Sequence, residues 1–229
     1  TTLFLLNKKL KSEEEYLPIK ISFEGIGDSV FEDEKSFSKA FLQIVEKNLI
    51  FNNKNLSGFL EEERVKIQNL NDLSNVITKL VMKADKKVVL MIDEVDKSSN
   101  NQLFLSFLGM LRNKYLLRNE EEDITFHSVI LAGVHDVKSL RFKIRTDEDH
   151  KYNSPWNIAS DFDVDMSFSK VEIGTMLDEY VKDKGVVLDK EYFSERLYFY
   201  TSGYPFLVSK LCKIIDEKIM IDGDLQWKK

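Results

Sequence analysis

The sequence has little of what small secreted or fibrous proteins depend on. Of its 229 residues one is cysteine, three are proline and nine are glycine. The single cysteine, Cys212, excludes an internal disulfide framework and suits a reducing compartment, and its place among helix-spaced apolar residues indicates core packing. No apolar run approaches the length of a membrane span, and the first residues do not resemble a signal peptide. We therefore expect a soluble cytoplasmic protein without a membrane partner.

Basic residues are outnumbered by acidic ones. Lysine and arginine number 33 against 39 aspartates and glutamates, which gives a formal net charge of −6. Such a balance does not favour non-specific binding to a phosphate backbone, so nucleic acid is not an expected partner. The three histidines lack the spacing of metal ligands. Hydrophobic residues make up 43% of the chain, which is ample for a folded core.

What the sequence does contain is a short apolar run that ends in two acids. Residues 88–92 are all apolar, and Asp93 and Glu94 follow directly. An uninterrupted run rich in β-branched residues suits a strand buried on both faces of a parallel sheet. The acids then lie at the strand's carboxyl end, where α/β sheets bind ligands, and a cation would relieve their repulsion. The plainer alternative is a core strand followed by a polar turn.

Helical and strand patterns alternate around this run. Apolar residues at helical spacing predict helices over residues 1–10, 37–49, 71–84 and 103–115. Further strands are predicted over residues 17–23, 125–133 and 161–166. Strands that alternate with helices imply right-handed crossovers and a mainly parallel sheet.

Three details of this pattern can be checked separately. Residues 52–69 are polar and charged, and we expect a mobile surface segment there, helical at most in part. The helix over 103–115 is expected to direct Tyr115 inward with its apolar neighbours. Residues 120–123 are all acidic and are expected to form a solvated turn.

The end of the chain has the signals of a small helical bundle. Ser169 and Glu172 have the spacing of a capping box, and the helix they open is expected to stop near Gly185. A second helix is predicted over residues 189–200. Pro205 suits the first position of a third helix.

The opening residues resemble the end of a phosphate-binding loop. In the motif G-x-x-x-x-G-K-[ST] a glycine-rich loop runs into a helix whose first amides cradle phosphate. Thr1-Thr2-Leu3 looks like the tail of this motif, cut after its lysine, and no complete copy occurs elsewhere in the sequence. We expect the chain to be a fragment of a longer protein. The alternative for the two threonines is a simple helix N-cap.

Taken in order, several stretches resemble the bacterial AAA-like branch of the AAA+ and STAND ATPases. These are residues 1–3, 89–96, 128–134, 154–158 and 201–207. The resemblance implies a P-loop NTPase-like α/β core with a mainly parallel sheet flanked by helices, over residues 1–167. It implies a helical lid over residues 168–229, and ATP and Mg²⁺ as the cofactors.

The resemblance also implies roles for single residues of the core. Thr1 would ligate Mg²⁺, and Thr2 would lie beside the phosphates. Asp93, as the acid of a Walker B strand, would hold Mg²⁺. Glu94 would be the catalytic base or would orient the attacking water.

Further roles fall on the second half of the chain. A γ-phosphate sensor would lie at His135 or Asp136, where the alternative is a strand-end turn. Arg141 and Arg145 would be candidates for charge-neutralising fingers, although lone loop arginines are commonly surface residues. Gly203-Tyr204-Pro205 looks like the G-x-P turn that packs near nucleotide in the lid, and its alternative is an ordinary helix start.

These observations favour an ATPase module of a larger bacterial protein that couples nucleotide state to movement of a lid or partner. A fragment without the phosphate loop is expected to bind nucleotide weakly. A second hypothesis is a non-catalytic interaction domain that retains the fold, and a third is a DNA-handling ATPase, which the acidic balance disfavours. A second copy of the chain or a protein partner fits the first two hypotheses.

Overall fold

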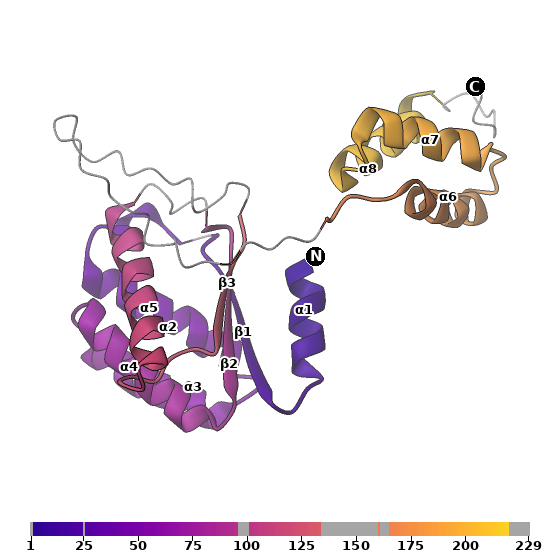
Figure 1. Cartoon of the computed structure of the whole chain (residues 1–229). Coiled ribbons are helices and arrows are strands. Elements are labelled where there is room, and N and C mark those ends of the chain that lie inside the picture. Colours follow the sequence, from indigo (N-terminus) through magenta and orange to yellow (C-terminus); the bar gives the residue numbers. More distant parts are fainter. Residues whose placement is uncertain (1, 25, 96–100, 134–159, 161–164, 220–229) are drawn as a thin grey trace. The chain divides into compact units, whose positions relative to one another are not determined.

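The chain folds as two compact units, Thr1–Ala159 and Ser160–Lys229, which are described separately below (Figure 1). A computed structural model describes residues 2–24, 26–95, 101–133, 160 and 165–219. The predicted boundary between an ATPase core and a lid, between residues 167 and 168, stays a prediction. Within the described residues, no helix has both the length and the apolar character needed to cross a membrane.

The first unit is built on a parallel sheet of three described strands. These are β1 (Tyr16–Ser22), β2 (Lys87–Asp93) and β3 (Ser128–Leu131), in the order β1-β2-β3. Both neighbours run parallel to the central β2, with Ser22 opposite Asp93 at the end of the longer ladder. Residues 88–92 of β2 are all buried, as predicted for a strand covered on both faces. The predicted mixed α/β architecture with a parallel sheet is therefore confirmed.

Helices flank the sheet on both sides. They are α1 (Thr2–Lys11), the 3-10 turn η1 (Asp28–Phe31), α2 (Glu34–Leu49), α3 (Lys54–Lys66), α4 (Leu70–Ala84) and α5 (Gln102–Asn119). Figure 1 shows α1 beside one face of the sheet and α2, α3, α4 and α5 on the other. The core lies between the sheet and this larger helical layer, where Leu90 and Ile92 of β2 join a group of buried phenylalanines. Buried apolar residues on one face stabilise α2, α3, α4 and α5, whereas α1 has no fully buried residue.

Helix α3 corrects the expectation for residues 52–69. Most of this segment forms a regular helix, capped by the Asn53 side chain, which accepts a hydrogen bond from the Leu56 amide. Leu56 and Leu60 are buried one turn apart and pack into the core. Phe59 is partly buried and joins them on the same stripe, which packs against α2 and the core. The sequence signal was weak because charged residues dominate the segment.

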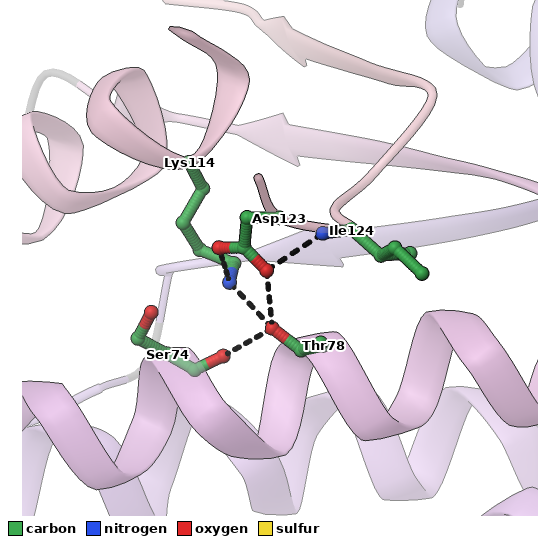
Figure 2. Close-up of polar contacts among 5 residues, drawn as sticks. All are labelled: Ser74, Thr78, Lys114, Asp123 and Ile124. Atoms are coloured by element: carbon green, nitrogen blue, oxygen red, sulfur yellow. Dashed lines mark hydrogen bonds and ion pairs between the residues drawn. The ribbon is translucent and has the colours of Figure 1, made fainter. Parts of the chain in front are cut away.

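A buried polar cluster corrects two further expectations, those for Tyr115 and for the acidic turn. Lys114, not Tyr115, is buried on α5, with 2% of its side chain exposed against 40% for Tyr115. The Lys114 ammonium donates to Asp123 Oδ2 and to Thr78 Oγ1, both at 2.6 Å. Figure 2 shows these groups converging between α5, α4 and the turn after α5. Asp123 is thus part of a largely buried network, whereas Glu120, Glu121 and Glu122 are exposed, as expected.

The cluster satisfies the Asp123 carboxylate from three directions. The Thr78 hydroxyl donates to Asp123 Oδ1 at 2.9 Å, and the Ile124 amide donates to the same oxygen at 2.6 Å. Burial by itself would raise the pKa of Asp123, but the hydrogen bonds from Lys114, Ile124 and Thr78 outweigh it and hold the pKa below its usual value. The network therefore joins two helices to the segment that leads into β3.

The second unit is helical, as predicted. It contains α6 (Lys170–Lys184), α7 (Lys190–Thr201), α8 (Pro205–Ile214) and a single π turn, η4 (Ile215–Ile219). The predicted capping box is present at the start of α6, and α6 ends at Gly185 with φ 66°. Pro205 is the first residue of α8. Both capping predictions are confirmed because caps depend on residues that are close in sequence.

The strand predictions were less accurate at their ends. The strand predicted over residues 125–133 forms only as β3, four residues long, although Phe126 just before it is buried. Of the strand predicted over residues 161–166, residues 161–164 lie outside the described residues, and Asp165 and Met166 are not in a strand. Boundaries are less determined by sequence because neighbouring strands decide where pairing stops.

Candidate functional site

The candidate site lies at the carboxyl end of β2, where the backbone is held from both sides. The Phe23 amide, just after β1, donates to the Asp93 carbonyl at 3.4 Å. On the other side the Ala132 amide donates to the Ile92 carbonyl at 2.9 Å, and the Val95 amide donates to the Ala132 carbonyl at 3.2 Å. Asp93 and Glu94 are therefore attached to a backbone with little freedom to move.

The backbone turns sharply between the two acids. Glu94 has φ 56°, in the left-handed region, which is uncommon for residues other than glycine. Its amide donates to Asp93 Oδ1 at 3.2 Å. A non-glycine residue in this conformation costs about 1–3 kcal/mol, and such residues cluster at functional sites. The turn ends the strand directly after Asp93 and marks this position as one where the fold tolerates strain.

A lysine that sequence reasoning missed lies against Asp93. Lys20 Nζ of β1 is 3.3 Å from Asp93 Oδ2, and the two side chains are 28% and 35% exposed. Lys20 is the only charged residue of the segment 17–23, which was its one visible signal. The pairing itself depends on the β1–β2 register, which no local pattern reveals.

The start of α1 lies at the same end of the sheet as the two acids. Residues 12–15 join α1 to β1, and the helix packs back along the strand that follows it. Figure 1 shows that the N-terminal end of α1 therefore points toward the carboxyl ends of the strands. Thr2 is the half-buried first residue of α1, and Thr1 lies outside the described residues. The amides of a first helical turn and the helix dipole make such a helix start suited to an anion.

The chemistry of these donors fits one kind of metal site. Among the residues that the structure describes, no three acids, histidines or cysteines come together as a metal cage. Mg²⁺ commonly takes one or two carboxylates and completes its shell with water and substrate phosphates. Asp93 and Glu94, with a helix start at the same end of the sheet, fit an ion that arrives with phosphate. They do not fit a metal held by protein ligands alone.

Four other predicted site residues fall outside the part of the chain that the structure describes. His135, Asp136, Arg141 and Arg145 lie outside the described residues. Their roles as sensor or arginine finger stay predictions.

The turn at Gly203 and Pro205 belongs to the second unit. The Phe168 amide donates to the Gly203 carbonyl at 2.8 Å. Gly203 has φ 76°, and a Cβ there would lie 2.0 Å from the Phe168 carbonyl oxygen. Glycine is required by this close approach and by the left-handed backbone. The turn thus has a packing role inside its own unit, and its role near nucleotide stays a prediction.

Cys212 has the character expected of a packing residue. It is partly buried on α8, beside the small core of the second unit. Burial raises the pKa of its thiol to about 11. A thiol with such a pKa is protonated at neutral pH and is a poor nucleophile. Cys212 is therefore not a candidate nucleophile, in agreement with the packing role predicted for it.

Comparison with known proteins identifies a family for this chain. A family model described as "Predicted AAA-ATPase" matches residues 2–141, which is more than half of the 229 residues. The matched segment contains α1, all three described strands and the two acids. A search among curated proteins gives no match. The chain belongs to the AAA-ATPase-like family that this model describes.

Proposed function

We propose that this chain is the ATP-binding and ATP-hydrolysing module of a larger bacterial protein, in which nucleotide state moves a lid or a partner. The observation that carries the proposal is the pair Asp93 and Glu94 at the carboxyl end of the central strand. Their backbone is held on both sides, and Glu94 is held in a strained turn. Membership of the AAA-ATPase-like family supports ATP as the ligand.

The phosphate end of the ligand would be bound by two parts of the first unit. The amides at the start of α1 would donate to phosphate oxygens, and Thr2 would lie beside them. Asp93 would hold Mg²⁺, directly or through a water, and the Thr1 hydroxyl would be its second protein ligand. When bound, Mg²⁺ neutralises charge that develops on the phosphates.

Glu94 would act on the water that attacks the γ-phosphate. A carboxylate one residue beyond the metal-holding acid can accept a hydrogen bond from this water and take its proton. The hydrogen bond between Val95 and Ala132 holds the backbone just after Glu94. A fixed backbone lowers the cost of placing the carboxylate, because little freedom remains to be lost.

Three further elements complete the proposed cycle. His135 or Asp136 would sense the γ-phosphate, and Arg145, or Arg141, would neutralise phosphate charge on a neighbouring subunit. The Gly203-Tyr204-Pro205 turn would report nucleotide state in the helical lid. These roles rest on the family resemblance.

The test is hydrolysis by the intact protein with single acids neutralised. We expect Asp93→Asn to lose binding of Mg²⁺–ATP together with hydrolysis. We expect Glu94→Gln to keep binding while kcat falls by about 10²–10⁴-fold, the range for loss of a general base. Glu15→Gln is the matched control, because Glu15 precedes β1 at the opposite end of the sheet. Normal turnover by both site variants would refute the assignment.

A non-catalytic interaction domain is the second candidate. Phe4 and Leu5 of α1 are largely exposed apolar side chains, which a protein partner would bury. This candidate predicts that the intact protein binds no Mg²⁺–ATP, and that Phe4→Ser weakens partner binding. Calorimetric titration of the intact protein with Mg²⁺–ATP separates the two candidates.

A further inference from the structure

We propose that Lys20 is the resident counterion of Asp93, and that an arriving divalent cation displaces it. The inference rests on the proposed function, since it concerns the same metal site. It assigns a role to a residue that the family resemblance did not point to. Lys20 Nζ lies 3.3 Å from Asp93 Oδ2, on the oxygen that does not accept from the Glu94 amide.

The sheet places Lys20 where it can reach Asp93. Lys20 is opposite Met91 and Ser22 is opposite Asp93 in the parallel register. Side chains alternate along each strand, so Lys20 and Asp93 are on the same face and one diagonal step apart. The Asn48 side chain of α2 donates to the Lys20 carbonyl at 2.6 Å, which holds the backbone of β1 at this point. The ammonium therefore reaches Asp93 from a fixed base.

The ion pair between Lys20 and Asp93 is weak enough for a divalent cation to displace it. Adjacent carboxylates repel each other, and the Lys20 ammonium offsets this cost while no metal is present. Both side chains are partly exposed, at 28% and 35%, so water screens the attraction and the pair contributes little to stability. A divalent ion carries twice the charge and binds carboxylate oxygen at about 2.0–2.1 Å, so it outcompetes the ammonium.

A structural explanation for Lys20 must be separated from this one. β1 is at one edge of the described sheet, and lysines on edge strands prevent pairing with other chains. That role would make Lys20 variants aggregate, but it would leave metal affinity unchanged. Lys87 is the matched control, because it pairs with Glu15 at the opposite end of the same sheet, with 46% and 57% exposure.

The experiment is a titration of the intact protein with Mn²⁺ in the presence of a non-hydrolysable ATP analogue, which supplies phosphate ligands, followed by electron paramagnetic resonance. We expect Lys20→Met to bind Mn²⁺ about fivefold more tightly than wild type, because a competing charge is removed; this ratio equals about 1 kcal/mol. Lys20→Arg and Lys87→Met should stay within about twofold of wild type, a difference below 0.5 kcal/mol by the same conversion. Far-UV circular dichroism verifies that each variant is folded.

Two readouts keep the inference separable from the proposed function. If Asp93→Asn loses Mn²⁺ while Lys20→Met binds as wild type does, the role of Lys20 is refuted and the metal site stands. If wild type binds no Mn²⁺, or Asp93→Asn binds it equally well, the proposed metal site is refuted and the role of Lys20 with it.

Should Lys20→Met fail to fold, the NMR signal of the Lys20 ε-methylene group in the wild-type protein decides. It should move toward the free-lysine position as Mg²⁺ is added, and a signal that stays unchanged at Mg²⁺ saturation refutes displacement.

Discussion

Replacing Lys114 by methionine removes the charged end of a buried side chain and leaves its carboxylate partner behind. The Lys114 and Asp123 side chains are 2% and 18% exposed, and their charged atoms are 2.6 Å apart (Figure 2). Removing one partner of a buried pair costs about 3–5 kcal/mol, because the other charge remains without compensation. Asp123 keeps its hydrogen bonds from Thr78 and Ile124, so we expect the lower end, about 3 kcal/mol.

This loss is large enough to measure by two methods. For a unit of this size it corresponds to a fall in Tm of about 6–12 °C. Urea unfolding followed by far-UV circular dichroism should show the same loss of unfolding free energy with an unchanged dependence on urea. Lys87→Met is the control, since its pair with Glu15 is exposed and is worth about 0–1 kcal/mol.

A second variant tests the cause of the loss. Lys114→Met combined with Asp123→Asn removes both charges and keeps groups that hydrogen-bond with Thr78 and Ile124. We expect it to recover at least half of the lost stability, because the buried uncompensated charge is gone. The reasoning is wrong if Lys114→Met costs less than about 1 kcal/mol, the scale of an exposed pair. It is also wrong if the double variant is no more stable than the single one.

Three further predictions follow from the same structure. The pKa of Asp123 is lowered in the folded state, so its contribution is present above the unfolded pKa of about 3.9 and is lost as the pH falls through the lower folded value; acid unfolding of the Lys114→Met, Asp123→Asn variant should lack this component. Gly203→Ala should destabilise the second unit by about 1–3 kcal/mol, since it combines a left-handed backbone with a clash against the Phe168 carbonyl. Gly58→Ala, at an exposed position of α3, should stabilise the first unit by about 0.5–1 kcal/mol in thermal unfolding. Burial raises the pKa of Cys212 to about 11, so iodoacetamide should label it far more slowly in the native chain than in urea at pH 7.5; equal rates would contradict the burial.

Local signals in the sequence were enough for much of the fold. Apolar spacing predicted α2 and α4, and the capping box predicted the start of α6. The unbroken apolar run predicted that β2 is covered on both faces. Each of these features depends on residues within a few positions of one another, so the physical cause is contained in a short window. The two acids of the candidate site were visible for the same reason.

What depends on pairing between distant segments was not visible. Lys20 meets Asp93 because β1 and β2 pair in one register, although 73 positions separate the two residues. On α5 the apolar pattern favoured Tyr115, yet Lys114 is buried, because Thr78 and Asp123 from other segments satisfy its charge. A buried charge is stable only if its partners are supplied by the tertiary structure.

The sequence by itself therefore determined the central strand, the acids at its end and the helical character of the last segment. The tertiary structure alone decided which charges those acids and the buried lysine meet. The physical reason is that backbone periodicity and capping act over single turns, whereas electrostatic partners are chosen by strand register and helix packing.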